Sequence, residues 1–441
     1  MASEWIEVPA SEFCDSVRDG THDSPKQVES GKLLVTSRHI TGNRLDLSSA
    51  YMISNDDYEE INRRSKVDHW DVLFTMIGTV GEPCLVSEEP NYAIKNIGLF
   101  KNKTEVRGKY LYYYLCSPEA QHHTKAHSRG TTQQYIPLGA LRKFPIRYPE
   151  DENEMLAITN ILGSLDDKIE LNRRMNATLE GMAQALFKSW FVDFEPVIDN
   201  ALEAGNPIPD EFAERAQTRR TLLRQGSGGQ EALSDFPTPG TNVSNVRKNF
   251  PDSFQTSELG PIPTEWEIGK ILDLFELHRG FDLSAKKRTA GSFPVYSAGG
   301  IHGMHNEYKM EPPGIITGRS GVIGNVYLSL TQYWPLNTTL YVRNFRKSGP
   351  FYALHFLKLL DLKVYNSGSA VPSLNRNHVH ASDTVVPAAT ALKEFERFAE
   401  SLYVKIKANI EASESLSKLR DTLLPKLISG ELRVESLNGE G

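Results

Sequence analysis

The chain of 441 residues is too long for one ordinary hydrophobic core, so it predicts two or more domains. Hydrophobic residues make up 39% of it, which is enough for packed interiors and excludes wholesale disorder. The sequence contains neither an apolar run of the roughly 18 residues that a membrane span needs nor a secretory signal at its start. Its three cysteines lack the paired spacing of a zinc site or a disulfide framework, so we expect no metal and a reducing cytoplasm.

The net charge of −7 does not exclude nucleic acid as a partner, because the charges are unevenly distributed. Residues 193–260 hold 11 acids against 6 bases, whereas residues 261–385 hold 13 bases against 9 acids. Phosphate binding needs a local positive face rather than a basic total.

Residues 1–150 predict a mixed α/β domain. Val72–Met76 and Cys84–Val86 are short apolar runs bounded by Gly and Pro, which is typical of strands. The segment Gly78-Thr-Val-Gly81 predicts a turn between them, and Tyr110–Cys116 predicts a helix with an aromatic face.

Residues 151–192 predict a long helix that begins with a capping box formed by Asp151 and Glu154. The next segment, residues 193–260, predicts an acidic linker that is loose over much of its length, because it contains Gly226-Ser-Gly-Gly229 and Phe236-Pro-Thr-Pro-Gly240. Within this linker, Glu211–Leu223 is expected to form a short helix.

Residues 261–386 predict a second domain that repeats the first. The segment Gly78-Thr-Val-Gly81 returns as Gly318-Arg-Ser-Gly321 after 240 residues, and Asn96 returns as Asn337 after 241. An offset that changes so little indicates an internal duplication. The second copy accordingly predicts strands at Ile315–Thr317 and Val326–Leu328 and a helix at Tyr352–Leu360.

Residues 387–430 predict a second long helix that ends at Gly430, followed by a tail over residues 431–441. Both long helices carry seam residues at alternating spacings of four and three, with a polar break in the middle. The seam residues expected to pair the helices are Leu162, Leu165, Ile169, Asn172, Asn176, Leu179, Leu402, Ile406, Asn409, Ser413 and Leu416.

An antiparallel coiled coil centred between residues 172 and 176 would place Asn172 opposite Ser413 and Asn176 opposite Asn409, so that the polar groups find partners. The alternative is that each stripe packs on a domain core. The seam is roughly 50 Å long at 1.5 Å per residue, which favours the coiled coil. The predicted fold is mixed α/β, with two repeated globular domains joined by two long helices that form an antiparallel coiled coil.

These features together resemble the specificity (S) subunits of type I restriction–modification systems, over nearly the whole chain. The segments that carry the resemblance are the Trp5 region with Gly20-Thr-His-Asp-Ser-Pro25, the Gly78–Gly81 turn, Leu179–Phe194, Ser257–Pro263 before Trp266, and Leu419–Leu432. The linker is longer than the family pattern.

The resemblance implies that residues 1–150 and 261–386 are target-recognition domains, each reading one half of a bipartite site in double-stranded DNA. It implies that the coiled coil sets the gap between the half-sites and docks two methyltransferase (M) subunits, and that restriction (R) subunits join the complex. S-adenosylmethionine, ATP and Mg are expected on those partner subunits, so this chain is expected to bind no cofactor and to catalyse nothing.

Candidate DNA contacts lie in polar loops and basic turns, where Asn and Gln side chains can read adenine and Arg can read guanine. For any one of these residues, an ordinary solvated loop is an equally good explanation. The candidates are Arg38, His39, Arg129, Thr131, Thr132, Gln133 and Gln134 in the first domain, and Lys286, Lys287, Arg288, Arg319, Ser320, Ser369, Ser373, Asn375 and Arg376 in the second.

The sequence contains no methylase motif of the Asn-Pro-Pro-aromatic type and no phosphate-binding loop of the Gly-x4-Gly-Lys-Ser/Thr type. His123 and His127 have a metal-like spacing but lack a third ligand, so we expect surface histidines. A stand-alone methyltransferase would need a cofactor motif. A purely structural coiled-coil adaptor would not need two elaborate domains.

Overall fold

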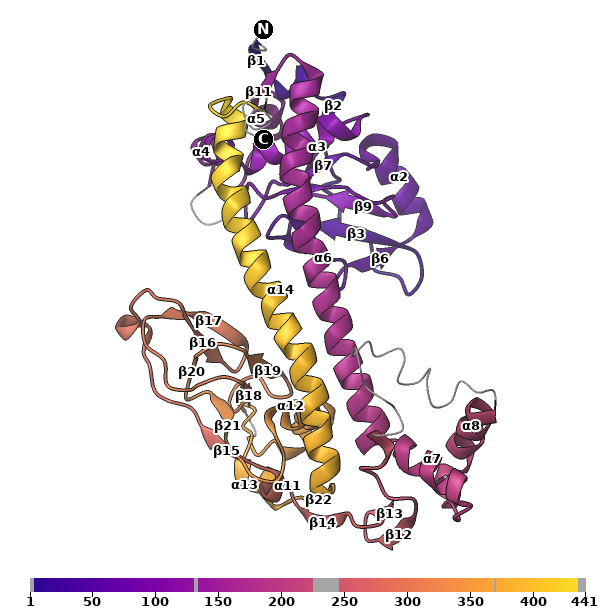
Figure 1. Cartoon of the computed structure of the whole chain (residues 1–441). Coiled ribbons are helices and arrows are strands. Elements are labelled where there is room, and N and C mark those ends of the chain that lie inside the picture. The colour runs from indigo at the N-terminus through magenta and orange to yellow at the C-terminus, as the bar shows by residue number, and fades with distance from the viewer. Residues whose placement is uncertain (1–3, 131–133, 225–245, 369, 435–441) are drawn as a thin grey trace. The chain divides into compact units, whose positions relative to one another are not determined.

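The computed structural model describes residues 4–130, 134–224, 246–368 and 370–434, which fall into two units. The first unit comprises Met1–Asn172 with Glu411–Gly441, and the second comprises Arg173–Ile410. Each unit contains one domain and a part of each of two long helices, α6 (Glu152–Phe191) and α14 (Ala389–Ser429) (Figure 1). Among the described residues, no helix combines the length and the apolarity needed to cross a membrane.

The first unit is built around an antiparallel sheet with the strand order β2-β10-β7-β8. A second sheet has the order β6-β3-β9, in which β3 runs antiparallel to β6 and parallel to β9. The strands are β1 (Trp5–Pro9), β2 (Ser16–Asp19), β3 (Lys32–Thr36), β4 (Ile40–Thr41), β5 (Arg44–Leu45), β6 (Tyr51–Ile53), β7 (Val72–Thr75), β8 (Pro83–Leu85), β9 (Tyr92–Lys95), β10 (Ile97–Lys101) and β11 (Pro145–Pro149). The helices are α1 (Ala10–Phe13), η1 (Ser37–His39), α2 (Asn55–Ser65), α3 (Glu105–Cys116), α4 (Pro118–His127) and α5 (Leu138–Arg142).

The second unit repeats this topology. Its sheets have the orders β15-β21-β18-β19 and β17-β16-β20, and β16 runs antiparallel to β17 and parallel to β20. The strands are β12 (Phe254–Ser257), β13 (Gly260–Pro263), β14 (Glu267–Lys270), β15 (Phe275–Arg279), β16 (Phe293–Ser297), β17 (Gly300–His305), β18 (Gly314–Gly318), β19 (Val326–Ser329), β20 (Trp334–Pro335), β21 (Thr339–Phe345) and β22 (Asp383–Val386). The helices are α7 (Glu195–Ala204), η2 (Asp210–Phe212), α8 (Ala213–Arg224), α11 (Ile271–Leu274), η3 (Ala285–Lys287), α12 (Pro350–Leu359), η4 (Leu362–Tyr365) and α13 (Arg376–Ala381).

The matching sheet orders confirm the predicted duplication and the mixed α/β class. In both units the terminal strand pair is also the same, since β1 pairs antiparallel with β11 and β14 pairs antiparallel with β22. The predicted strands and helices all form, although α3 begins at Glu105 rather than at Tyr110.

The outer stretches of the two long helices belong to the domain cores. In the first unit, Ile158 of α6 and Leu427 of α14 are buried in one cluster with Tyr110 of α3. In the second unit, Trp190 of α6 and Phe395 of α14 share a core cluster. The alternative prediction, that each apolar stripe packs on a domain core, is therefore correct for these outer stretches.

The middle of each helix instead carries the predicted polar pairs. In the first unit the Asn172 amide donates a hydrogen bond to the Ser413 hydroxyl at 3.1 Å. In the second unit the Asn409 amide donates to the Asn176 carbonyl oxygen at 2.8 Å. Both pairs are the ones expected of an antiparallel register, and every predicted seam residue is buried or half-buried.

The prediction of a loose linker over residues 193–260 is wrong for its described parts. Helices α7 and α8 form there, and the Arg219 guanidinium binds the buried Asp199 carboxylate at 2.8 Å. Phe194 and Phe250 join the core of the second unit. The polar composition misleads because these charges are paired and a few apolar residues are enough to anchor the segment. The expected short helix is confirmed by η2 and α8, whereas the two Gly-rich stretches lie outside the described residues.

The start of α6 and the end of α14 have defined contacts within the first unit. The Asp151 carboxylate caps α6 by accepting a hydrogen bond from the backbone N–H of Asn153 at 2.9 Å, and Glu154 binds Arg433 of the tail at 2.7 Å. Gly430 adopts φ = 75° directly after α14, as the predicted helix stop requires.

Candidate nucleic-acid interface

The second unit contains a cleft of about 700 Å³ that brings together several predicted DNA contacts from separate segments. Arg319 reaches it from the turn after β18, and Ser373, Asn375 and Arg376 reach it from the loop before α13. The rest of its lining comprises His278, Arg279, Gly280, Phe281, Asp282, Leu340, Ser367, Leu374 and Asn377.

Backbone hydrogen bonds fix the turn against the loop. The N–H of Leu374 donates to the Arg319 carbonyl at 2.8 Å, and the N–H of Gly321 donates to the Pro372 carbonyl at 2.9 Å. Ser320 and Ser373 form a β-bridge next to these bonds. The predicted turn over residues 318–321 is confirmed, since it lies between two strands and Gly321 adopts φ = 93°.

The cleft is cationic, because Arg279, Arg319 and Arg376 line it against one carboxylate, Asp282. The Arg279 guanidinium binds Asp282 at 3.1 Å, and the Arg319 Nε donates to the backbone carbonyl of Asn337 at 3.0 Å. Such a surface can hold phosphates, and its guanidinium groups can recognise guanine.

Asn375 has a positioning role in this site. Its side-chain oxygen accepts a hydrogen bond from the N–H of Asn377 at 2.9 Å and so caps α13. Because Arg376 is the first residue of that helix, the cap holds it at the edge of the cleft. Ser369 lies outside the described residues.

The predicted basic turn, Lys286 to Arg288, lies apart from the cleft. Lys286 and Lys287 are exposed on η3, and the Arg288 guanidinium donates to the backbone carbonyl of His302 in β17 at 2.8 Å. The segment that begins with Gly280 to Asp282 in the cleft wall runs directly into this turn.

The first unit builds a turn and loop of the same kind. Ile77 forms a β-bridge with Tyr135, and the N–H of Gly78 donates to the Gln134 carbonyl at 3.0 Å. Arg129 and Tyr135 exchange two backbone hydrogen bonds of 2.8 Å across the loop. The predicted contacts Arg129 and Gln134 are exposed there, whereas Thr131, Thr132 and Gln133 lie outside the described residues.

Sequence reasoning missed a polar pair that occurs at matching places in both units. In the first unit, His22 Nδ1 lies 2.7 Å from the Asn96 side-chain oxygen. In the second unit, the Asn337 amide donates to Asp282. The return of Asn96 as Asn337 was the available signal, because a polar residue kept at the same place in two buried frameworks indicates a specific partner.

Arg38 and His39 occupy different environments. Arg38 is exposed on η1, next to Ser37, whose hydroxyl donates to the Asn96 carbonyl at 3.2 Å. His39 is only 1% exposed, and its Nδ1 accepts a hydrogen bond from the N–H of Thr36 at 2.9 Å. Burial, reinforced by the Arg38 charge, lowers the pKa of His39. The expectation that His39 contacts DNA does not fit this position, since the imidazole caps a turn below the surface.

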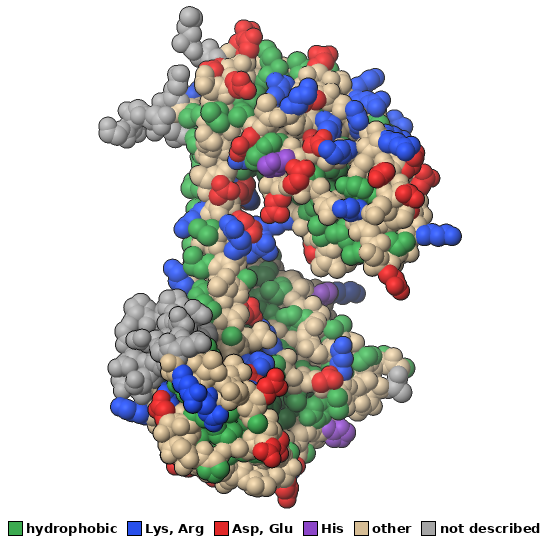
Figure 2. Space-filling view, turned by 90° about the vertical axis from the view of Figure 1, so that its right-hand side faces the viewer, with side chains coloured by type: hydrophobic (Ala, Val, Ile, Leu, Met, Phe, Trp, Pro, Cys, Tyr) green, Lys and Arg blue, Asp and Glu red, His purple; other side chains and the backbone are tan. Residues whose placement is uncertain are grey.

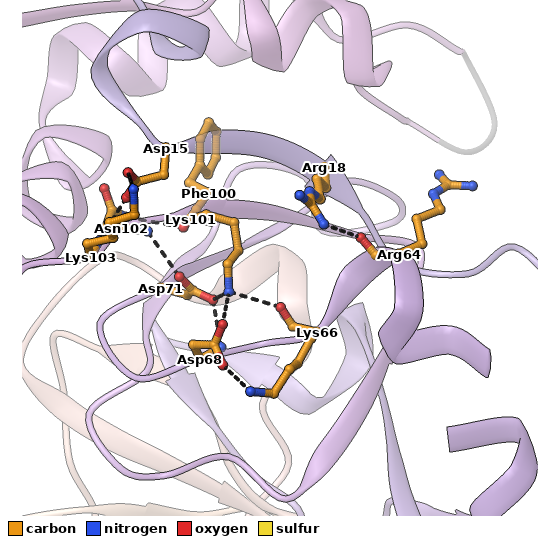
Figure 3. A network of polar contacts seen from close by, with 10 residues as sticks. All are labelled: Asp15, Arg18, Arg64, Lys66, Asp68, Asp71, Phe100, Lys101, Asn102 and Lys103. Carbon is orange, nitrogen blue, oxygen red and sulfur yellow. Dashed lines mark hydrogen bonds and ion pairs between the residues drawn. The ribbon is translucent and has the colours of Figure 1, made fainter. Parts of the chain in front are cut away.

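A network of ion pairs surrounds the end of α2 in the first unit (Figure 3). Lys101 Nζ lies 2.6 Å from Asp71, 2.5 Å from Asp68 and 3.0 Å from the backbone carbonyl of Lys66. Burial raises the pKa of Asp71 despite these partners. Over the first unit, Figure 2 shows Lys and Arg side chains interspersed with Asp and Glu, so positive charge there is broken by acids.

Within the part of the chain that the structure describes, no group of three or more potential ligands is placed to hold a metal ion. The rings of His123 and His127 stack at 4.0 Å between centroids, and His123 also packs on Phe144. Their spacing therefore reflects packing on one helix face.

Comparison with known proteins identifies the family. Residues 2–181 and 263–381 match the family described as type I restriction modification DNA specificity domain. The chain belongs to this family. As a member, it is a DNA-specificity component rather than a catalytic subunit, which confirms the resemblance drawn from the sequence.

Among similar proteins, the chain is 27% identical to the type I restriction enzyme HindI specificity subunit of Haemophilus influenzae, covering 78% of this chain and 82% of the relative. It is 25% identical to the MjaIX specificity subunit of Methanocaldococcus jannaschii, covering 76% and 71%. The crystal structure of a type I restriction-modification S subunit from M. genitalium covers 97% of this chain and 96% of its own at 16% identity, with a TM-score of 0.53, which shows a shared fold.

Proposed function

We propose that each unit reads one half of a bipartite site in double-stranded DNA, and that the two half-sites differ in sequence. The observation that carries this proposal is the duplicated site: a turn after a central strand is bridged to a polar loop in both units. The framework is the same, but the side chains on it differ, since His22 in the first unit corresponds to Asp282 in the second.

In the second unit, Arg319 and Arg376 are the proposed base-reading residues, because a guanidinium can bind guanine through two hydrogen bonds. Lys286 and Lys287 are proposed to contact phosphates, which position a protein without reading sequence. In the first unit, Arg38, Arg129 and Gln134 are the corresponding proposals, together with the loop residues Thr131, Thr132 and Gln133. Ser320, Ser369 and Ser373 are proposed to contact the second half-site.

The two long helices are proposed to form a coiled coil that sets the gap and docks two methyltransferase subunits, while restriction subunits join through the complex. Exposed apolar residues on both helices, Leu171, Val404 and Ile410, support a protein partner there. S-adenosylmethionine, ATP and Mg are assigned to these partners, and the cytoplasm is the proposed compartment.

An exchange of residues 1–150 for the corresponding domain of a relative tests the division of labour. The hybrid, assembled with its methyltransferase subunits, should methylate a site that is altered in one half only. Mapping of methylated DNA measures this, and a change of both halves together would contradict independent reading. The chain without the methyltransferase should transfer no methyl groups.

A matched deletion tests the spacer. Residues 173–179 and 406–412 lie opposite each other in the antiparallel register that the Asn409–Asn176 hydrogen bond defines. Removing both segments shortens each helix by about 10 Å, which corresponds to roughly three base pairs. The gap should shrink by that amount while each half-site stays the same. An unchanged gap would show that the helices do not determine the spacing.

A further inference from the structure

The β16–β17 hairpin of the second unit presents apolar side chains to solvent. Strand β17 lies at the edge of its sheet, in the order β17-β16-β20. Ile301 is 62% exposed and Met304 is 45% exposed, and both belong to β17, which pairs antiparallel with β16. A single exposed apolar side chain is ordinary on a protein surface, so the significance of this pair depends on its surroundings.

A β-bulge places these two side chains on the same face. Ile301 pairs with Tyr296 and Met304 pairs with Pro294, so three steps along β17 correspond to two along β16. Gly303 adopts φ = 120° within the bulge, which a residue with a side chain rarely tolerates. Side chains three positions apart in a strand normally point to opposite faces. The extra residue in β17 reverses this, so Ile301 and Met304 are expected on the same face.

The first unit covers one face of the equivalent sheet with a helix, although Met52 of β6 is itself 39% exposed. There β6 is followed by α2, and Ile53 of the strand is buried with Ile61 of the helix and Leu34 of β3. Eighteen residues separate β6 from β7, whereas eight separate β17 from β18, so the second unit has no room for such a helix. The β16–β17 hairpin therefore lacks the helix that covers the equivalent sheet of the first unit.

The surroundings of the open hairpin are basic. Residues 285–310 contain four Lys or Arg residues and one acid, Glu307. Lys286 and Lys287 precede Arg288, whose guanidinium donates to the His302 carbonyl of β17, so the basic turn is tied to the hairpin through Arg288. A basic rim around a small apolar tip matches a nucleic-acid duplex better than a protein surface.

We propose that this hairpin is a second DNA contact of the second unit, in which Ile301 and Met304 insert at a base step of the minor groove while Lys286 and Lys287 hold the flanking phosphates. This inference rests on the proposed function. The cleft and the hairpin are joined in sequence by the short segment from Asp282 to Ala285, and one duplex is proposed to engage both. Insertion unstacks the step and bends the DNA, whereas the cleft reads the bases.

The test uses the full chain assembled with its methyltransferase subunits and a duplex that carries the recognised site and a fluorophore at each end. The wild-type complex should bring the ends closer in energy-transfer measurements. The double variant Ile301→Ala/Met304→Ala should abolish that bend and weaken binding about tenfold, with the methylated sequence unchanged. Leu259→Ala, which shortens another exposed apolar side chain of this unit, serves as the matched control and should bend DNA normally.

The double variant Lys286→Ala/Lys287→Ala tests the proposed phosphate contacts through the salt dependence of DNA binding. Each lost phosphate contact should reduce the slope of log affinity against log salt by about one, so the double variant should lose about two. Lys347→Ala, which removes a cation paired with Glu267, should leave the slope as it is.

A bend that persists in the Ile301→Ala/Met304→Ala variant would overturn the proposal. Loss of methyltransferase assembly in size-exclusion chromatography, with bending intact in the remaining complex, would also overturn it and assign the hairpin to a protein partner. In both cases the proposed function stands if Arg376→Ala still alters the second half-site. A wild-type complex without sequence-specific binding would refute the proposed function itself.

Discussion

The two units have the same strand order but cover their sheets differently. In the first, α2 packs on β6-β3-β9 and an ion-pair network around Lys101 surrounds its end. In the second, the described residues between β17 and β18 contain no helix, and β17 lies at the edge of its sheet. The strand order depends on buried apolar residues that both copies retain, whereas the covering elements and the loops are free to differ. A duplicated framework can therefore present two unlike surfaces to one ligand.

The tryptophans that open the two domains differ in the same way. Trp266 is 2% exposed and packs on Phe191 and Phe194, with ring centroids 5.9 and 5.6 Å apart. Trp5 is half-buried between the guanidinium groups of Arg147 and Arg433, at 5.6 and 5.5 Å from its ring. The same residue type thus lies inside an apolar core in one unit and between the core and two guanidinium groups in the other.

Removing each tryptophan should give the largest difference between the units. Trp266→Ala should lower the free energy of unfolding of the second unit by about 3–5 kcal/mol, because it leaves a cavity in the core. Trp5→Ala should cost the first unit about 1–2 kcal/mol, since the cation–π contacts are partly exposed. Hydrogen exchange resolved by segment, measured across a denaturant series, reports each unit separately. Equal losses would mean that the two positions are energetically equivalent.

Glu396 should give the second unit a pH dependence that the matching position of the first unit does not supply. Glu396 accepts hydrogen bonds from the N–H groups of Phe351 and Tyr352 at 3.2 and 2.7 Å, and burial raises its pKa from 4.5 to about 7. The matching residue of the first unit, 237 positions earlier, is Thr159. Folded Glu396 holds its proton more tightly than the unfolded chain does, so its contribution to stability falls as the pH rises from about 4.5 to 7.

The change should amount to about 3 kcal/mol at most. Glu396→Gln should remove it, as measured by the difference between the two proteins in unfolding free energy at a series of pH values. His355, whose pKa burial lowers to about 3, has the opposite dependence and loses stability as the pH falls below 6.5. Because His355 is present in both proteins, it cancels in the difference. A flat difference would contradict the assignment to Glu396.

The comparison also shows which features can be predicted from sequence. The duplication was predictable because Gly78 and Gly318 stand at turns that each copy needs, so their spacing survives divergence elsewhere. The polar pairs were predictable because a buried Asn needs a partner, and one antiparallel register supplies it for both. The Asp199–Arg219 pair was not predictable, since two charges 20 residues apart look solvated until a fold brings them together.

The candidate site was only partly predictable. Arg319 and Arg376 were recognised as polar loop residues, and the fold brings them into one cleft. Arg279 and Asp282 were missed because they follow a strand whose end has no distinctive pattern. The burial of His39 depends on how η1 folds back on its own strand, which no local pattern indicates.

The cleft of the second unit and the turn and loop of the first unit should recognise DNA independently. Arg376→Ala should weaken binding by roughly 1–3 kcal/mol on sites with the native second half and should relax the sequence preference in that half only. Gln134→Ala should act in the same way on the first half. Duplexes randomised in one half at a time measure both effects. If either variant changes the preference in the half assigned to the other unit, the assignment of half-sites is wrong.

The smallest expected effect tests the two polar pairs of the helices. Asn172 and Asn409 are buried, whereas their partners Ser413 and Asn176 are half-buried. Each unit therefore contains one buried amide that needs a hydrogen-bond partner inside the protein. Asn172→Leu alone removes the hydrogen bond that the Ser413 hydroxyl accepts, and Ser413→Leu alone removes the hydrogen bond that the Asn172 amide donates. The double variant removes both polar groups and should be milder than either single one.

A double-mutant cycle should therefore give a coupling of about 1 kcal/mol for Asn172 with Ser413. The same cycle on Asn176 with Asn409 should give a similar value, because an amide donates one hydrogen bond to a neutral oxygen in each pair. Changing all four residues to Leu should raise the melting temperature of the helices, since apolar burial replaces two modest hydrogen bonds. The gap between half-sites should then become less strictly defined, because Leu pairs equally well in shifted registers. Coupling near zero in one pair and not in the other would mean that the polar break fixes the register from one unit alone.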